Sequence, residues 1–442
     1  MKKEKFNLKM LKVKNNPGIT LIALVISIIV LLILAGVSIA TLTGENGILT
    51  QAQNAKTETE KAKAKEQIEL CATESVIAGS GSVNKATLKD SLVREGATIE
   101  TADGEISTLP VIVKLDEKEY GITGSGEVLN VESNITNVST EFVKENVIVK
   151  DTEGSFFVLP AGYKVLTSEA TKVTEGIVIK NNIGNEYVWI PCTVDGANGT
   201  LKYQRTKWGV ETDNGTEAFK DELTLLNSDV TYSEADTSNG INADISKEIV
   251  SQIQAEKKSI STYGGYYIGR YETGVLNNTA VIQYNQTPYA EIKWSTAYNL
   301  VKGIEVGNRG TSYLCSSYAW DTAINFIQSN TTFKNYATTR TAEMNENWVD
   351  MEVKDSSGNK IKDAGTAQRL ETGRTTAKAN IYDMGGNVSE FTTELMPGTS
   401  ETVVFRGGPY ANVEPAGYRY DDGAGSSGGN SIYGFRATLF LK

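Results

Sequence analysis

The 442-residue sequence contains no histidine. This absence excludes catalysis by Ser-His-Asp or Cys-His groups, metal sites with histidine ligands, and pH switches that depend on imidazole. Only three cysteines occur, Cys71, Cys192 and Cys315, far apart along the chain. Their odd number and wide spacing predict neither a disulfide framework nor a zinc site.

Positive charge is also scarce, since 43 Lys and Arg stand against 54 Asp and Glu, for a net charge of −11. Several of the lysines are concentrated before residue 15, so the rest of the chain is more acidic still. An acidic surface repels phosphate backbones. We therefore expect no nucleic-acid partner.

Charged residues are absent from position 15 to position 44, and residues 19–43 form one long apolar run. At a rise of about 1.5 Å per residue, a helix over this run exceeds about 30 Å, the thickness of the hydrocarbon core of a bilayer. The run predicts a single membrane-spanning helix.

The lysine-rich leader ends at Gly18, and the apolar run opens with Ile19. A short basic leader, a glycine and a long apolar helix together resemble the N-terminus of type IV pilins and pseudopilins. The resemblance implies that a prepilin peptidase cuts after Gly18 and methylates Ile19, and that the helix packs against other pilin subunits. Many pilins have Glu where this chain has Ala23, which favours a minor pilin or an anchored protein over a major pilin.

A plain signal anchor with its lysines on the cytoplasmic side is the alternative interpretation of the same segment. Both interpretations predict a single-pass protein of the cell membrane with most of its mass outside the cell. The pilin interpretation also allows a place in a surface filament.

The expected fold class is α+β with several domains. After the leader, 1–18, a thin apolar stripe between Lys and Glu predicts that the membrane helix continues as a stalk, giving one segment over residues 19–78. Residues 83–132 then combine a short helix with alternating strands, which is typical of the small α+β head of a pilin. The predicted strands of this head cover residues 109–115, 119–122 and 127–130.

Residues 143–184 are β throughout and are interpreted as a lead-in to a last domain, 185–442. That domain contains motifs in the order found in formylglycine-generating-enzyme-like (sulfatase-modifying factor) domains. The motifs are YVWIP (187–191), YYIGRYE (266–272), NIYDMGGNVSEFT (380–392), FRGG (405–408) and GFR (434–436). The resemblance implies a variant of the C-type lectin fold.

The enzymes of that family oxidise their substrate with a pair of cysteines between the RGG and GFR motifs. This chain has no cysteine between Arg406 and Arg436, so the nucleophile is missing. We therefore expect a non-catalytic domain, with residual formylglycine-type activity as the less favoured alternative.

A calcium site is implied by the same resemblance. In the family, the segment around GNVxE contributes oxygen ligands, which here correspond to Asn387, the Val388 carbonyl and Glu390. Hard oxygen donors close in sequence suit Ca²⁺. The alternative is that Asn387 and Glu390 bond to neighbouring backbone, so Ca²⁺ is an open expectation and no other cofactor is predicted.

Residues 409–433 are rich in Tyr, Asn, Asp, Ser and Gly and lie between the RGG and GFR motifs. In these two motifs we expect a structural role for Arg406, Gly407, Gly408, Phe435 and Arg436. Tyrosine offers a large contact area at low entropic cost, and Ser, Gly and Asn adapt their hydrogen bonds. The segment resembles the variable region of the target proteins of diversity-generating retroelements; an ordinary glycine-rich surface loop is the alternative. The predicted ligand contacts are Tyr410, Asn412, Tyr418, Tyr420, Asp421, Asp422, Asn430 and Tyr433.

Two function classes follow. One is a surface adhesin that presents a lectin-like domain to an unidentified surface protein or glycan. The other is a structural minor pilin or pseudopilin that caps a filament or a secretion machine.

Overall fold

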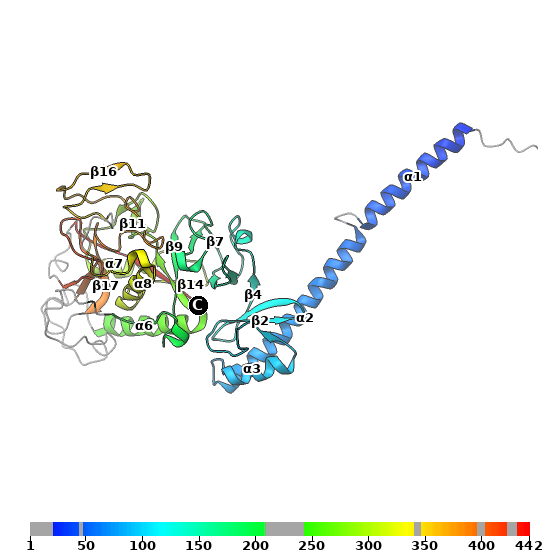
Figure 1. Ribbon diagram of the computed structural model, residues 1–442, viewed down its shortest axis with the longest axis horizontal. Coiled ribbons are helices and arrows are strands. Elements are labelled where there is room, and N and C mark those ends of the chain that lie inside the picture. Colours follow the sequence, from blue (N-terminus) through cyan, green and yellow to red (C-terminus); the bar gives the residue numbers. More distant parts are fainter. Residues whose placement is uncertain are drawn as a thin grey trace, which may run out of the picture. The chain divides into compact units, whose positions relative to one another are not determined.

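The computed structural model describes residues 21–43, 47–206, 208, 243–339, 346–395, 403–421 and 431–442. The chain separates into two compact units, Met1–Glu66 and Gln67–Lys442. Helices and sheets are mixed throughout the second unit (Figure 1). The α+β class predicted from the sequence is confirmed.

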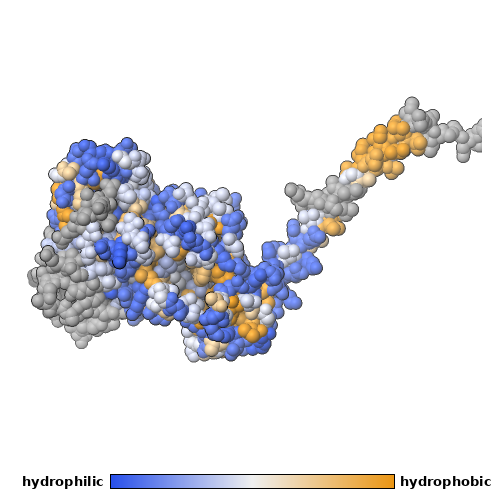
Figure 2. All heavy atoms as spheres, viewed as in Figure 1, coloured by the Kyte–Doolittle hydropathy of each residue, from blue (hydrophilic) through white to orange (hydrophobic). Residues whose placement is uncertain are grey.

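The first unit contains α1 (Leu21–Thr43) and the beginning of α2 (Ile48–Ala78). Large apolar side chains of α1 between Leu24 and Val37 are exposed, and they form the hydrophobic surface of this helix in Figure 2. Within the residues that the structure describes, no helix has both the length and the apolar character that a membrane crossing requires.

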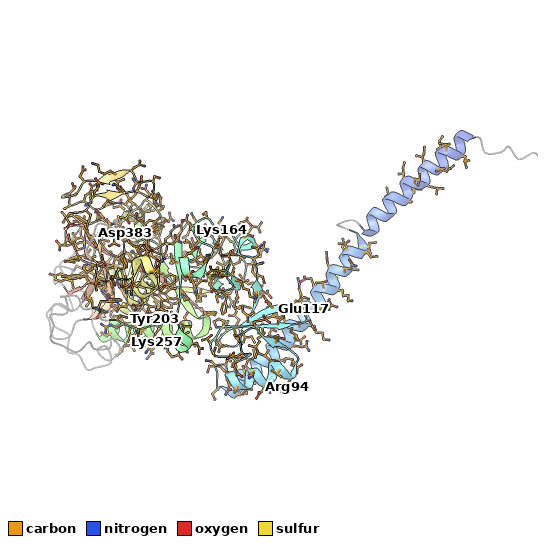
Figure 3. The ribbon with its side chains drawn as sticks, in the orientation of Figure 1. Arg94, Glu117, Lys164, Tyr203, Lys257 and Asp383 are labelled. Carbon is orange, nitrogen blue, oxygen red and sulfur yellow. The ribbon has the colours of Figure 1, made fainter. Side chains whose placement is uncertain are left out.

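The second unit begins inside α2, whose buried face includes Ile68, Ala72 and Ser75. Next comes α3 (Lys85–Arg94), where the side chain of Asn84 caps the first turn by accepting from the Thr87 amide. Arg94, labelled in Figure 3, pairs with Glu74 of α2 at 2.6 Å. The two helices are thus held together on the same side of the head.

The head, as the term is used below, runs from the buried end of α2 to β6. Its sheet has the order β1-β2-β3-β4-β5-β6 in the described residues. Its strands β2, β3 and β4 match the predicted meander, and β5 pairs with β4 in parallel. The strands are β1 (Thr98–Ile99), β2 (Val111–Leu115), β3 (Lys118–Ile122), β4 (Val128–Glu132), β5 (Val147–Lys150) and β6 (Phe156–Leu159), with the short helix η1 (Ile135–Val138) before β5.

Residues 143–184 do not form a sheet of their own. Their first two strands, β5 and β6, complete the head sheet, whereas β7 (Tyr163–Val165) and β8 (Val178–Asn181) belong to the sheet of the C-terminal part. The short helix η2 (Val173–Glu175) lies between β7 and β8. The segment therefore joins the two sheets through backbone hydrogen bonds on both sides.

The C-terminal part, which runs from β7 to the last strand, β21, is built on a sheet of order β14-β21-β10-β9-β8-β7. Helix α6 packs through Ile249, Ile253 and Ile260, which are buried. The further elements are β9 (Glu186–Pro191), η3 (Ala197–Gly199), α6 (Ala243–Tyr263), β10 (Gly265–Gly269), α7 (Trp294–Lys302), β14 (Gly310–Leu314), α8 (Ser317–Ser329), η4 (Thr331–Phe333) and β21 (Ala437–Leu441).

A second sheet, of order β19-β18-β17-β20, carries the last two motifs. Its strands are β17 (Ser389–Leu395), β18 (Val403–Arg406), β19 (Arg419–Asp421) and β20 (Tyr433–Phe435). Smaller sheets are formed by β11 (Gly274–Leu276), β12 (Thr279–Val281), β13 (Thr287–Pro288), β15 (Val353–Lys354) and β16 (Lys360–Lys362).

Direct contacts connect the head to the C-terminal part within the second unit. The Gly124 amide donates to the Thr262 carbonyl at 2.9 Å, and the buried Tyr267 hydroxyl donates to the Val158 carbonyl at 2.8 Å. A side chain at Gly124 would come within 2.3 Å of a backbone oxygen of α6, so only glycine fits there. The head and the C-terminal part are thus in direct contact at both places.

Candidate functional site

The RGG motif forms the support of the predicted ligand segment. Gly407 has φ 85° and Gly408 has φ 70°, a left-handed conformation that glycine adopts without strain. A Cβ atom at Gly407 would lie 2.7 Å from the Met384 carbonyl oxygen. Both glycines are therefore required by the backbone path, in line with their expected structural role.

Hydrogen bonds to other parts of the domain fix the turn that precedes β19. The Gly417 amide donates to the Ala337 carbonyl at 2.9 Å, and the Trp320 indole donates to the Ala416 carbonyl at 3.2 Å. Arg406 donates through Nε to the Tyr418 carbonyl at 2.9 Å. These bonds hold the backbone immediately before β19 in one position.

Beyond this turn, side chains alternate between the surface and the interior. Tyr418 is partly exposed, Arg419 is buried and Tyr420 is 43% exposed, which is the two-residue period of a strand. The rings of Tyr418 and Tyr420 stack, with centroids 6.0 Å apart and planes at 20°. The result is a pair of tyrosines presented on one face.

Buried charges lie below the tyrosine pair. Arg406 bonds to Asp321 at 2.6 Å, and Arg419 bonds to Asp321 and, at 3.0 Å, to Glu394. Burial and the neighbouring Arg419 guanidinium lower the pKa of Arg406 to about 9. Both acidic partners are nearly inaccessible to solvent, and loss of Asp321 would leave the buried Arg406 guanidinium without its counter-charge.

The sequence did not identify Arg419, Asp321 and Glu394 as part of this site. The alternation Tyr-Arg-Tyr at 418–420 contained the signal, because it places the arginine opposite the two tyrosines. The two acids come from α8 and β17, and no local pattern connects them to β19.

The other predicted contacts lie in different surroundings. Tyr410 is partly exposed and its hydroxyl bonds to the Ser431 hydroxyl at 2.9 Å, and Asn412 is exposed. Asp421 ends β19. Asp422 and Asn430 lie outside the described residues, as do the predicted processing residues Gly18 and Ile19.

Tyr433 requires a correction. It is 4% exposed, and its ring stacks on Phe405 with centroids 4.1 Å apart. It pairs with Ser389 in the parallel register of β20 with β17. Its place is in the core, where the apolar ring is removed from water by packing on Phe405, and it offers no contact surface to a ligand.

The proposed calcium ligands are already engaged with protein groups. Asn387 Oδ1 accepts from the Asn347 amide at 2.9 Å and from the Leu370 backbone amide at 3.0 Å. Glu390 is fully buried and pairs with Arg436 at 2.6 Å. Asn387 and Glu390 thus have protein partners: Asn387 bonds to the Leu370 backbone, as the alternative expected, whereas the partner of Glu390 is the side chain of Arg436.

The described residues also contain no group of three or more Cys, Asp or Glu placed to hold a metal. The acidic side chains near Asn387 instead serve as hydrogen-bond acceptors: Glu272 accepts from the Asn387 side chain at 2.6 Å and from the Val388 amide at 3.0 Å. Burial, followed by the charges of Asp383 and Glu390, raises the pKa of Glu272 well above its usual value.

All three cysteines are buried and none is in a disulfide. Burial raises the pKa of the Cys192 and Cys315 thiols well above the usual value. A thiol in such surroundings is a poor source of thiolate.

Comparison with known proteins found no matching family model and no matching curated protein. Among solved structures, the chain matches the crystal structure of CarF at 19% identity and a TM-score of 0.23, over 31% of this chain and 50% of that one. It matches Treponema denticola variable protein 1 at 18% identity and a TM-score of 0.22, over 39% of this chain and 62% of that one. The chain thus spans less than two thirds of either protein, and similarity of this degree carries no argument about its function.

Proposed function

We propose that this protein is a pilin-like protein anchored in the cell membrane, which displays a non-catalytic, lectin-like domain that binds a surface protein or glycan. The proposed contact surface, called the tyrosine surface below, is centred on Tyr418 and Tyr420. The remaining predicted contacts, Tyr410, Asn412, Asp421, Asp422 and Asn430, are kept as proposed contacts of the same ligand. The observation that carries the proposal is the stacked, outward-facing pair Tyr418 and Tyr420 on a strand whose intervening residue is anchored in the core.

The rigid support favours binding. Association costs entropy for every side chain and loop that it immobilises. Here the Gly417 amide and the Tyr418 carbonyl are already bonded to Ala337 and Arg406, so the backbone is ordered before a ligand arrives. Tyrosine adds a large, amphipathic contact area with only two side-chain torsions to restrain.

The absence of an enzymatic role is part of the proposal. The sequence between Arg406 and Arg436 has no cysteine, and the raised pKa values of Cys192 and Cys315 disfavour thiolate chemistry elsewhere in the domain. Membrane attachment is proposed from the apolar run at residues 19–43 and its basic leader.

The prepilin-like leader also favours a second candidate, a minor pilin or pseudopilin whose C-terminal domain caps a filament or secretion machine. Location distinguishes the two. A capping subunit occurs in few copies at filament tips, whereas an independent adhesin stays in the membrane when the other pilus genes are deleted.

The direct test is the double variant Tyr418→Ala/Tyr420→Ala in the full chain. We expect cells that display it to lose attachment to the host surface or glycan that the wild type binds, with a nearly unchanged melting temperature because both rings face outward. Tyr284→Ala is the matched control, since Tyr284 is 50% exposed but lies outside the tyrosine surface. Equal attachment by the double variant, or loss of its fold, contradicts the proposal.

A further inference from the structure

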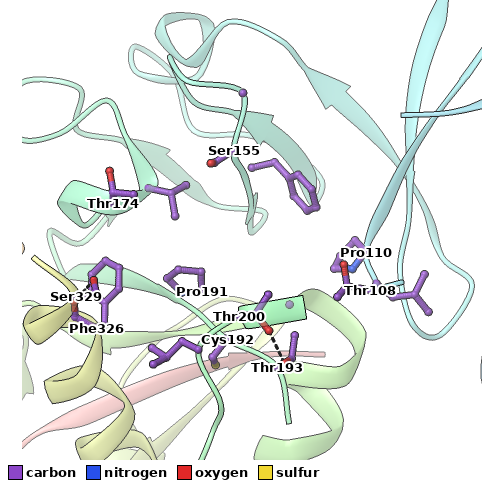
Figure 4. A pocket seen from close by; sticks show the side chains of 17 residues that line it. Thr108, Pro110, Ser155, Thr174, Pro191, Cys192, Thr193, Thr200, Phe326 and Ser329 are labelled. Carbon is purple, nitrogen blue, oxygen red and sulfur yellow. Dashed lines mark hydrogen bonds between the residues drawn. The ribbon is translucent and has the colours of Figure 1, made fainter. Parts of the chain in front are cut away.

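A cleft of about 620 Å³ lies between the head and the C-terminal part (Figure 4), and its lining includes no residue of the tyrosine surface. Its walls come from separate segments of the chain: the loop before β2, the β5–β6 turn, η2, the residues after β9, the residue after α6 and the end of α8. In Figure 4, Ser155 and Thr174 lie across the opening from Pro191 and Thr193. Small-molecule sites have volumes of roughly 300–1,000 Å³ and occur preferentially where domains meet.

The width of the cleft is set by close packing. Gly264, directly after α6, faces Pro110 of the head so closely that an added Cβ would meet the proline ring at 3.0 Å. The Cys192 amide bonds to the Gly264 carbonyl at 3.1 Å, which ties the opposite wall to the same point. The cleft is therefore preformed.

The lining is uncharged. Charged residues make up 22% of the chain, yet none of the described residues that line the cleft is Asp, Glu, Lys or Arg. A charged ligand in this cleft would lose hydration with no counter-charge in return. The lining thus selects for an uncharged occupant.

The floor and the rim differ in chemistry. The floor is apolar, with Pro110, Cys192 and Phe326 buried, whereas the rim carries exposed hydroxyl side chains such as Ser155 and Thr174. On one side the rim hydroxyls of Thr193 and Thr200 bond to each other at 2.8 Å.

The hydroxyls on the opposite side are available. Those of Thr108, Ser155 and Thr174 form no hydrogen bond with any residue in the described part of the chain. They come from the head loop, the β5–β6 turn and η2, so they surround the opening from different directions (Figure 4). An occupant with several hydroxyls at its edges could bond to all three.

We infer that this cleft binds a neutral saccharide of about two residues. A pyranose ring has apolar C–H faces that match the floor, hydroxyls at its edge that match the rim, and no charge. A fatty acyl chain would leave the rim hydroxyls unused, and a charged sugar would be excluded by the lack of a counter-ion. The site is separate from the tyrosine surface, and its occupation links the head to the C-terminal part.

The test uses saturation-transfer NMR on the purified chain with maltose, cellobiose, lactose and N,N′-diacetylchitobiose, each up to about 10 mM, which detects a Kd of about 1 mM. We expect at least one to bind, and 3′-sialyllactose, which is charged, not to bind. Thr174→Trp, at an exposed position on the rim, should fill the opening and weaken binding by at least about tenfold. Glu175→Trp is the matched control, because the neighbouring Glu175 is exposed and does not line the cleft.

Two further measurements keep the outcome clear. Unchanged melting temperatures show that both tryptophan variants are folded, and Tyr418→Ala/Tyr420→Ala should bind the disaccharide as the wild type does. Failure of all four neutral disaccharides to bind, equal binding of 3′-sialyllactose, or unchanged binding by Thr174→Trp overturns the inference.

Discussion

Arg436 and Glu390 form a fully buried pair through two hydrogen bonds, from Nε to Oε2 at 3.0 Å and from Nη2 to Oε1 at 2.6 Å. Arg436 also donates to the Gly269 carbonyl at 2.9 Å and to the Tyr382 carbonyl at 2.8 Å. One guanidinium therefore connects the GFR motif, the NVSE segment, the end of β10 and the loop before β17. These motifs meet in space because they share a single ionic centre.

This pair predicts an asymmetric response to mutation. Arg436→Met alone should cost about 3–5 kcal/mol of stability, because it leaves a buried carboxylate without its partner. The double variant Arg436→Met/Glu390→Leu should recover a large part of that loss. Urea denaturation of residues 48–442, which begin at the start of α2, measures both, and a double variant no more stable than the single one would contradict the prediction.

The acidic groups around Arg436 predict a pH dependence of stability. Burial raises the pKa of Asp383, and it raises that of Glu390 to about 7. Above the ordinary carboxyl pKa of about 4, the folded protein holds protons that the unfolded chain has released. The contribution of these protonated carboxyl groups to the free energy of unfolding is therefore complete below about pH 4 and is lost as the pH rises through about 7. We expect the melting temperature to fall over that range.

Asp383→Asn tests this assignment. The substituted amide cannot ionise, and asparagine tolerates the φ of 55° found at this position. The variant should show a weaker fall in melting temperature than the wild type. Asp116→Asn is the control, with a similar φ of 49° at an exposed site, and identical pH profiles for the wild type and Asp383→Asn would refute the prediction.

Calcium should have no effect on stability. The oxygens of Asn387 and Glu390 are bonded to Asn347, Leu370 and Arg436, so binding a cation would require breaking these bonds. A specific ligand at 100 times its Kd stabilises by about 2.7 kcal/mol. We expect the melting temperature of residues 48–442 to be equal in excess calcium and in EDTA; an increase of several degrees with calcium would show that the site exists.

Formylglycine synthesis should not be detected. Residues 48–442, incubated with oxygen, copper and a cysteine-containing sulfatase peptide, should leave the peptide unchanged, because no cysteine lies between Arg406 and Arg436. Mass spectrometry of the peptide is the measurement, with an active formylglycine-generating enzyme as the positive control. The shorter fragment 186–442 is unsuitable, since it lacks β7 and β8 of the C-terminal sheet. Aldehyde product would contradict the non-catalytic proposal.

Processing at the leader is predicted from sequence alone. The mature protein should begin at a methylated Ile19, and Gly18→Arg should abolish cleavage because the prepilin peptidase reads the glycine before the apolar run. Gly44→Arg, at the far end of that run, is the control and should be cleaved normally. Mass spectrometry of the surface protein decides the point, and an intact leader would eliminate the pilin interpretation.

Local patterns were sufficient for many elements. The alternation at 109–115, 119–122 and 127–130 predicted β2, β3 and β4, because the two-residue period of a strand is written directly in the sequence. Glycines with positive φ, such as Gly407, were also recognisable as structural, since few other residues adopt that conformation.

Local patterns did not predict which strands pair across long distances in the sequence. The strands of 143–184 have the same pattern whether they join the head sheet or the C-terminal sheet, and only the fold assigns β5 to one and β7 to the other. Tyr433 and Tyr420 are chemically identical, yet one stacks on Phe405 in the core and the other faces outward. Tyrosine suits both surroundings because its ring is apolar and its hydroxyl is polar.

The sequence by itself determined the chemistry that this protein lacks, its acidic balance, its apolar N-terminal run and the strand periods of its head, because these depend on residue identity and local spacing. Only the tertiary structure decided that Arg419 is held by Asp321 and Glu394, that Asn387 and Glu390 are already bonded to protein groups, and that an uncharged cleft opens between the head and the C-terminal part. Those relationships depend on which distant segments come together, and neighbouring residues along the chain do not specify that.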